Sequence, residues 1–227
     1  MIEEEYNIFT EEIAEPISTY KTKSSIIKEI LEYLRKDNLK LSKKHKDGRL
    51  NASINEDEVL NSLHKKFELN IPKSRAWFDF SFEESGIFYP VNIKVTDTTH
   101  ADNLNCKLGI YYSLTGILPD FSNEINWMRY FEKLKTNLSR HKNKDYHFLV
   151  INKNNTEDVF HNTLRGLKKI QPNGNNLPFQ CKWNENRIYE KRSFQNSVNF
   201  ILTNFGKSIK LRSEIYFNFK KYFNEFL

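Results

Sequence analysis

The sequence predicts an α/β protein in which a mixed sheet is flanked by helices on both faces. Apolar and polar residues alternate over 76–82 and again over 87–96, which indicates a β-hairpin. Apolar residues recur at helical spacing before and after this hairpin, and the short apolar run 146–151 is typical of a buried strand. The chain has 227 residues, 38% of them hydrophobic, and no linker divides it. We therefore expect a single domain with a sizeable core.

Two amphipathic helices are expected before the hairpin. The first has Ser24 at its N-cap position and runs to Leu34. The second opens at Ser53, because Ser53 and Glu56 have the spacing of a capping box. Glu56 also continues the apolar stripe of its helix. It is therefore either the partner of Ser53 or an acid directed at a site.

The predicted hairpin places three polar side chains on one face of the sheet. If its turn is centred between residues 84 and 85, Asp79 on the first strand lies opposite Pro90 on the second. Opposed residues share a face, so Asp79, Asn92 and Lys94 project from the same side. The large apolar residues of both strands fill the other side.

Five further elements are expected beyond the hairpin, each from its apolar spacing or its turn residues. They are a helix over 102–116 ended by Gly116, a helix over 122–138, the strand 146–151, a helix over 159–170 and, beyond the turn-rich segment 171–182, a helix over 212–226. The last helix is rich in aromatic and basic residues, and we expect it to pack with its basic face outward.

Composition limits the classes of function. The net charge is +6, which favours a polyanionic partner, although many globular proteins carry such a charge without one. The two cysteines, Cys106 and Cys181, lack the spacing of a zinc site and are expected to be reduced thiols. We find no apolar window of membrane-spanning length and no signal-peptide pattern at the start, so a cytoplasmic location is expected. A Gly-rich phosphate loop, a nucleophile elbow and a metal-spaced His pair are also missing from the sequence.

The polar face of the hairpin has two interpretations. It is either the solvated side of an amphipathic hairpin or a site at which an acid, an amide and a lysine converge. A carboxylate and an amide oxygen from Asp79 and Asn92 can hold Mg²⁺, with Glu56 as a second carboxylate. Lys94 can then orient the attacking water beside a phosphate.

This arrangement resembles the PD-(D/E)xK nuclease superfamily, and within it the orthodox type II restriction endonucleases. Asp79 matches the first acid, Asn92-Ile93-Lys94 the second motif, and Glu56 the acid that such enzymes often carry on the preceding helix. The order helix, hairpin, helix, strand also matches the family's core over about 53–151. The resemblance implies a restriction-endonuclease-like fold and Mg²⁺-dependent hydrolysis of double-stranded DNA that leaves 5′-phosphates. It further implies a homodimer that serves a restriction-modification system.

Two positions depart from the family's pattern. Phe78 stands where a proline usually precedes the first acid, and Asn92 stands where a second acid is usual. Some members carry Asn or Gln at the second position, so activity remains compatible with the sequence. The alternatives are a non-catalytic, basic DNA- or RNA-binding protein on a degenerate nuclease fold, and a DNA repair or junction nuclease.

The resemblance also implies that residues 171–227 hold recognition and dimerisation elements. Segments 102–116 and 172–183 resemble the restriction enzymes that cut GANTC. We expect phosphate contacts from the basic segment 40–49 and from the loop that follows the second hairpin strand. We expect the amide side chains of 173–182 to read bases. The predicted DNA-binding residues are Lys43, Lys44, Lys46, Thr98, His100, Lys107, Asn173, Asn175, Asn176, Gln180 and Lys182. The alternatives are a solvated basic loop for 40–49 and an ordinary polar connection for 173–182.

Overall fold

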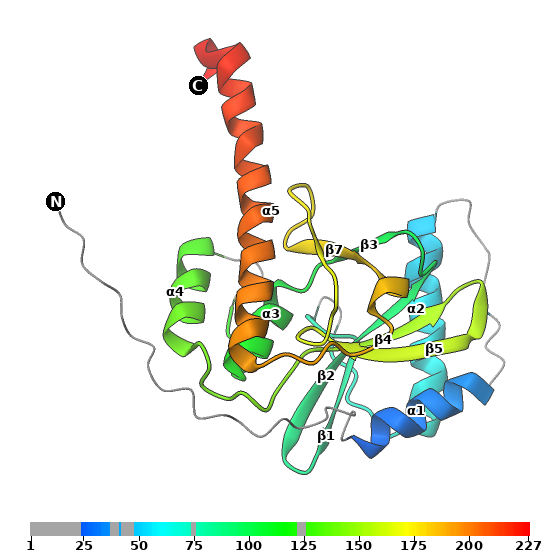
Figure 1. Cartoon of the computed structure of the whole chain (residues 1–227). Coiled ribbons are helices and arrows are strands. Elements are labelled where there is room, and N and C mark those ends of the chain that lie inside the picture. Colours follow the sequence, from blue (N-terminus) through cyan, green and yellow to red (C-terminus); the bar gives the residue numbers. More distant parts are fainter. Residues whose placement is uncertain (1–23, 37–40, 42–47, 74–75, 122–125) are drawn as a thin grey trace.

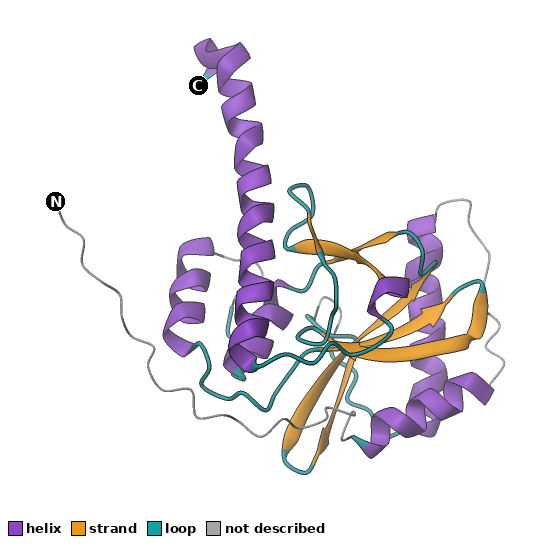
Figure 2. Ribbon diagram, in the orientation of Figure 1, coloured by secondary structure: helices purple, strands orange, loops and turns teal. Residues whose placement is uncertain are grey.

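The computed structural model of the chain describes residues 24–36, 41, 48–73, 76–121 and 126–227, without the side chains of 48–53 (Figure 1). Within this described part, five α-helices accompany a mixed four-stranded sheet and a smaller antiparallel sheet of three strands (Figure 2). The predicted mixed α/β class is therefore confirmed. Among the helices of the described residues, none has the length and apolarity that a membrane span requires.

The main sheet has the strand order β1-β2-β4-β5. Its strands are β1 (Phe80–Glu84), β2 (Ile87–Thr96), β4 (His147–Asn152) and β5 (Asn155–Thr163). β4 runs parallel to β2, whereas the β1–β2 and β4–β5 pairs are antiparallel. A parallel pair needs a crossover connection, and this one contains α3 (Lys107–Thr115) and α4 (Trp127–Asn137).

The smaller sheet has the order β3-β7-β6. It joins β3 (Ala101–Leu104), which follows β2 directly, to β6 (Gln171–Pro172) and β7 (Phe179–Lys182). A short 3₁₀ helix, η1 (Trp183–Asn186), and the long helix α5 (Phe194–Phe223) complete the C-terminal part. The smaller sheet therefore brings a late segment of the chain beside the end of β2.

Two apolar clusters cover opposite faces of the main sheet. Helices α1 (Ser25–Lys36) and α2 (Gly48–Lys66) pack on the face that carries Val91, Ile93 and Val95 of β2. Residues of α3, α4, α5 and the smaller sheet pack on the other face. Strand β4 contributes alternate side chains to both clusters, which explains why its sequence is a continuous apolar run.

Local signals at two helix ends are confirmed. The Ser24 hydroxyl accepts a hydrogen bond of 3.1 Å from the Ile27 amide, so Ser24 caps α1. Helix α3 ends at Gly116, whose φ of 68° is in the left-handed region and whose amide donates to the Tyr112 carbonyl at 2.7 Å. The buried strand expected over 146–151 is β4.

The hairpin is present, but its register differs from the predicted one. Its two-residue turn is Ser85-Gly86, with φ of 53° and 72°, as a type I′ turn requires. The pairing of Asp79 with Pro90 is therefore wrong, because Pro90 pairs with Ser81. The difference from the expected register is two residues, and a shift of two keeps every side chain on its face.

Two helix predictions before and after β2 are corrected. Helix α2 begins at Gly48, so Ser53 and Glu56 lie inside the helix and do not form the capping box at its start. Residues 102–104 belong to strand β3, and the helix expected from residue 102 begins only at Lys107. Pairing of β3 with β7 across the smaller sheet determines this segment.

The helix predicted over 159–170 is wrong, because residues 155–163 form strand β5. Its apolar residues do recur at helical spacing, but Val159 and Phe160 are buried from a strand and Leu164 and Leu167 from the turns after it. Strand β5 follows β4 through a two-residue turn and pairs along its free edge. Backbone pairing of that edge therefore overrides the local pattern.

The C-terminal helix is confirmed as a helix, but its expected packing is wrong. It is the second half of α5, followed by the short 3₁₀ helix η2 (Asn224–Phe226). Every residue from Leu211 to Leu227 is exposed. Figure 1 shows this half of α5 extending beyond the rest of the described elements.

Candidate active site

The hairpin brings the Asp79 carboxylate against the second strand. Oδ2 of Asp79 accepts a hydrogen bond of 2.8 Å from Nδ2 of Asn92 and one of 2.6 Å from the amide of Ile93. The Asp79 amide donates to the Val91 carbonyl at 2.9 Å, so the backbone before β1 is held to β2 as well. Asp79 and Asn92 are thus a fixed pair, and the acid is oriented by the strand that also carries Lys94.

Lys94 is surrounded by negative charge. It is one of two residues on β2, with Asn92, that line a cavity of about 190 Å³. Burial alone lowers the pKa of Lys94, but attraction to Asp102, Glu56 and Asp79 outweighs it and leaves the pKa above its ordinary value. Lys94 is therefore an ammonium group at neutral pH and acts as a cation, not as a base.

The surroundings of Glu56 and Asp79, in contrast, favour the uncharged forms of these side chains. Burial is the main cause that raises the pKa of Glu56 to about 7, with repulsion from Asp79 and Asp102 adding to it; Lys94 opposes this shift. Burial also raises the pKa of Asp79, against the hydrogen bond from Ile93 and the attraction of Lys94. A cation bound by the two carboxylates would lower both pKa values again, because a positive charge favours the ionised forms.

Asp102 is the site residue that sequence reasoning missed. The sequence predicts that residue 102 begins a helix over 102–116, and it assigns Asp102 no role in the site. On β3, Asp102 contributes to the field around Lys94 and Glu56, and its Oδ2 accepts a hydrogen bond of 2.8 Å from Nε1 of Trp183. Strand β3 has only four residues, too few for a period to be recognised, so no local signal could have placed Asp102 here.

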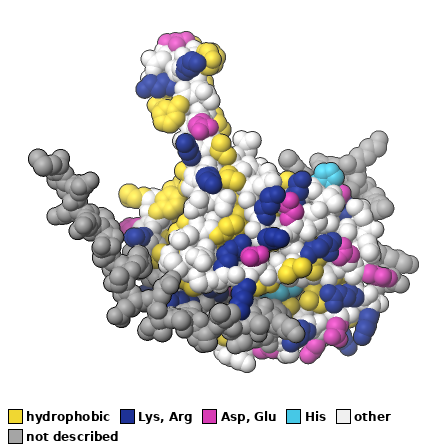
Figure 3. Space-filling model, in the orientation of Figure 1, with side chains coloured by type: hydrophobic (Ala, Val, Ile, Leu, Met, Phe, Trp, Pro, Cys, Tyr) yellow, Lys and Arg dark blue, Asp and Glu magenta, His cyan; other side chains and the backbone are white. Residues whose placement is uncertain are grey.

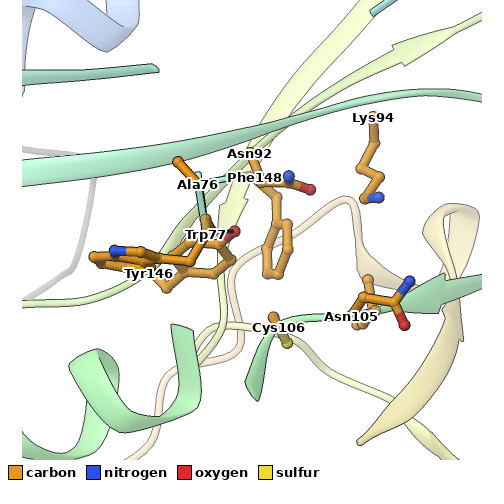
Figure 4. A pocket seen from close by; sticks show the side chains of 9 residues that line it. Ala76, Trp77, Asn92, Lys94, Asn105, Cys106, Tyr146 and Phe148 are labelled. Atoms are coloured by element: carbon orange, nitrogen blue, oxygen red, sulfur yellow. Dashed lines mark hydrogen bonds between the residues drawn. The ribbon is translucent and has the colours of Figure 1, made fainter. Parts of the chain in front are cut away.

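The cavity beside Lys94 has one polar wall and one apolar wall. Figure 4 shows the Lys94 side chain pointing from β2 towards Asn105 and Cys106 at the start of α3. Trp77 and Tyr146 lie at the other end, stacked with ring centroids 5.6 Å apart, and the Tyr146 hydroxyl donates to the Trp77 carbonyl at 2.6 Å. The cavity thus presents aromatic rings on one side and an ammonium group on the other.

The donor set fits a hard divalent cation with few protein ligands. Asp79 and Glu56 supply two carboxylates, and Asn92 supplies an amide oxygen once its nitrogen has bonded Asp79. In the part of the chain that the structure describes, no group of three His, Cys, Asp or Glu residues is arranged to hold a metal ion. Mg²⁺ characteristically uses one or two carboxylates and completes its shell with water and phosphate oxygens.

The predicted DNA-binding residues near β2 are placed unequally. Thr98 is 3% exposed, and its carbonyl accepts from the Asn184 amide at 2.9 Å, so its side chain is not presented at the surface. His100 is exposed, with Nδ1 3.2 Å from Oδ2 of Asp97. The Lys107 ammonium lies 5.6 Å from the centre of the Trp127 ring. Lys43, Lys44 and Lys46 lie outside the described residues.

The turn-rich segment 171–182 is more ordered than expected. The Asn173 amide group donates to Oδ1 of Asn103 at 2.9 Å and to Oε1 of Gln180 at 3.0 Å. Its oxygen accepts from the amides of Asn175 and Asn176, both at 3.0 Å. Asn173 and Gln180 therefore hold the turn, whereas Asn175 and Asn176 have exposed side chains. Lys182 is half-buried at the end of β7.

Charge on the surface is mixed. On the face shown in Figure 3, lysines and arginines lie among acidic residues over the body of the molecule.

Both cysteines are buried and form no disulfide, and burial raises the pKa of the Cys106 thiol to about 12. Neither thiol is therefore a nucleophile at neutral pH.

Comparison of the chain with protein-family models, with curated proteins and with solved structures found no match in any of the three. The geometry of the site is thus the basis on which function is argued.

Proposed function

We propose that this protein is a Mg²⁺-dependent endonuclease of double-stranded DNA, of the type II restriction class and the PD-(D/E)xK architecture. One observation carries the proposal: Asp79, Asn92 and Lys94 lie on one face of a hairpin, with Glu56 of α2 in the same electrostatic field. The order α2, β1–β2 hairpin, α3 and a strand parallel to β2 supports it, because the resemblance implies this order for the core.

The proposed chemistry assigns a separate task to each residue. Asp79 and Glu56 bind the cation, and the Asn92 amide orients Asp79 through the bond to Oδ2. Lys94 donates to a phosphate oxygen and positions the attacking water beside it. When bound, Mg²⁺ supplies Lewis-acid stabilisation of the charge that develops on the phosphate. The water oxygen forms a bond to phosphorus and releases a proton to solvent, while the bond to the 3′ oxygen breaks and that oxygen takes up a proton from solvent. The products are a 5′-phosphate and a 3′-hydroxyl.

Protonation favours this assignment of Lys94. A lysine that acts as a general base must lose its proton, whereas three carboxylates in its field keep the proton on Lys94. In this protonated form, Lys94 can stabilise negative charge on the phosphate. Glu56 and Asp79, whose pKa values are raised, complement this role of Lys94, because they become fully ionised when a cation binds.

A second candidate is a non-catalytic nucleic-acid-binding protein on the same fold. Asn92 favours it, because an amide replaces the second acid of the family's pattern and lowers the negative charge available to a cation. This candidate predicts salt-dependent binding to DNA or RNA and no cleavage with Mg²⁺ or Mn²⁺.

The experiment is incubation of the protein with a long linear DNA and Mg²⁺, followed by gel electrophoresis. Discrete fragments with mapped 5′-phosphate ends are the expected result. Intact DNA that is nevertheless shifted on a native gel would favour the non-catalytic candidate. Cleavage of branched or damaged DNA, without a discrete pattern on the linear substrate, would assign the protein to repair or junction processing.

A further inference from the structure

Helix α5 has a packed half and a projecting half. Along the first half, an apolar stripe with steps of three and four residues is buried against the body; it comprises Phe194, Val198, Ile201 and Phe205. The body ends at the turn 173–175. There Ser208 accepts from the Asn173 amide at 2.9 Å, and Arg212 donates to the carbonyls of Gly174 and Asn175 at 2.8 and 2.7 Å.

The apolar stripe continues beyond the point where the body ends. Ile215 and Tyr222 lie seven and fourteen residues after Ser208, and Phe219 lies seven after Arg212. The stripe therefore keeps the seven-residue period that packs the first half, with two polar residues only at the junction. A sustained period of 3.5 is the pattern with which helices pack against other helices.

The apolar arc of the projecting half is broad and exposed. Apart from Phe217 (63% exposed), which lies outside it, its large apolar side chains span an arc of about 160° at about 100° per residue. They are Leu211 (43% exposed), Ile215 (56%), Tyr216 (51%), Phe219 (45%), Tyr222 (67%), Phe223 (48%), Phe226 (74%) and Leu227 (62%). Among the described residues, the turn at Gly174 lies against Leu211, the side chains beyond it remain exposed, and Figure 3 shows apolar side chains along this projection. Such a face is stable in water only when something covers it.

We propose that the projecting half of α5 is a dimerisation arm, whose apolar arc packs against the same arc of a second copy of this chain. Because the two surfaces are identical, a two-fold axis pairs apolar with apolar on both sides. The inference deepens and rests on the proposed function, since cutting both strands of a symmetric site calls for two copies of the active site.

The available area is sufficient for such a dimer. An aromatic residue that becomes fully buried removes about 150–250 Å² from water. Five aromatic residues of the arc are roughly half exposed or more, and three aliphatic residues accompany them. Pairing of two arms therefore removes on the order of 600 Å² per copy, close to the roughly 800 Å² of a standard interface.

A helix partner fits the arm better than a lipid surface does. Helices that bind anionic membranes carry a polar face dominated by lysine and arginine. Here the polar face mixes signs, with Glu214 and Glu225 among Lys210, Lys220 and Lys221. Mixed charge on the outer face is typical of helix pairs in water.

The test is the mass of the full-length protein in solution, measured by light scattering at micromolar concentration without DNA or Mg²⁺. The expected mass is twice the protomer mass of 27.1 kDa. Phe219→Glu places a charge in the arc and should weaken dimerisation at least about 30-fold. Ser213→Glu adds the same charge outside the arc, about 120° around the helix from Phe219, and should leave the dimer intact.

Both substituted positions are exposed in the protomer, so both variants should keep the fold and helix content of the wild type; only Phe219→Glu, which loses the second copy, should melt at a lower temperature. A monomeric wild type would overturn the proposal, and so would a Phe219→Glu variant that remains dimeric. Co-flotation of the monomer with vesicles of anionic lipid would overturn it in favour of a lipid surface.

The mass measurement is independent of the nuclease assay. A dimer that Phe219→Glu disrupts, in a protein that never cleaves DNA, would keep the arm and reject the proposed function. A monomer that cleaves DNA with Mg²⁺ would keep the function and reject the arm. The two failures are therefore distinguishable.

Discussion

Two clusters of ionisable residues flank the main sheet, one half-buried and one largely buried, and they differ in how their charges are compensated. The site cluster consists of Glu56, Asp79, Lys94 and Asp102 around β2. The structural cluster consists of Asp145, His147, His161 and Arg165 at one end of β4 and β5. Both contain charged or titratable groups with little exposure, but only one has the character of a ligand site.

In the structural cluster, the chain itself supplies the partners. Oδ1 of Asp145 accepts from the Ser113 hydroxyl and the Tyr146 amide, both at 2.8 Å, and Oδ2 lies 3.2 Å from Nε of Arg165. Arg165 also donates to the carbonyls of residues 142 and 144 at 2.8 and 2.9 Å. This ion pair closes the connection between α4 and β4 and holds it to the turn after β5.

In the site cluster, the half-buried carboxylates of Glu56 and Asp79 have raised pKa values, and Lys94, which attracts both, lines a cavity. Lys94 compensates their negative charge only in part, so a bound cation would compensate the remainder. Burial of charged groups alone therefore does not identify a functional site. Charges that their neighbours compensate only in part, close to a cavity, do identify one.

The largest expected effect on stability belongs to the structural cluster. Asp145→Ala removes the carboxylate that faces the buried Arg165 guanidinium, and we expect the free energy of unfolding to fall by about 3–5 kcal/mol. Urea denaturation measures it. Asp120→Ala, which removes a strongly exposed acid that pairs with Lys133 at 3.2 Å, is the control and should cost about 1 kcal/mol or less. Equal effects of the two substitutions would contradict the comparison.

The histidine pair of the structural cluster predicts a dependence of stability on pH. Burial is the main cause that lowers the pKa of His147 to about 3, and that of His161 is lowered well below its ordinary value. The unfolded chain binds these protons near pH 6.5 but the folded chain does not, so stability should fall as pH drops below about 6.5 towards 3.

Between pH 6.5 and pH 5.5 the expected loss of stability is about 1 kcal/mol for each histidine, because the unfolded chain takes up its protons over this range. Denaturation at these two pH values measures it. His147→Gln should reduce this loss, whereas His100→Gln, at an exposed loop position, should not. A loss that is the same in His147→Gln as in the wild type would reject the assignment.

A smaller effect of opposite sign is expected in the site cluster. At pH 8, Glu56 is ionised in the folded and in the unfolded chain, but in the folded chain it is a desolvated carboxylate. Glu56→Gln removes that cost and should raise the free energy of unfolding by on the order of 1 kcal/mol. The exposed Glu157→Gln is the matched control. A destabilised Glu56→Gln protein would show that this acid serves the fold.

The sequence was sufficient for the hairpin and for the face on which Asp79, Asn92 and Lys94 lie, because the period of two determines the face even when the register is wrong by two residues. It was insufficient for Asp102 and for strand β5. In both, pairing with another strand decides the structure, because β3 pairs with the distant strand β7 and β5 with its neighbour β4, and the local pattern of apolar residues is ambiguous.

The C-terminal helix shows a different limit. Its helical pattern was readable, but the burial of its apolar residues could not be inferred from spacing alone. The first half packs and the second does not, although both keep the same period. Only the position of the turn 173–175, which ends the body at Ser208 and Arg212, separates them.

The most direct test of the central claim is the cleavage rate of the Lys94→Ala protein. We expect Mg²⁺-dependent cleavage of DNA to fall at least about 100-fold, because a cation beside the developing negative charge is lost. Binding to the same DNA should persist, and Lys153→Ala, in the exposed turn after β4, should cleave like the wild type. Undiminished cleavage by Lys94→Ala would contradict the account.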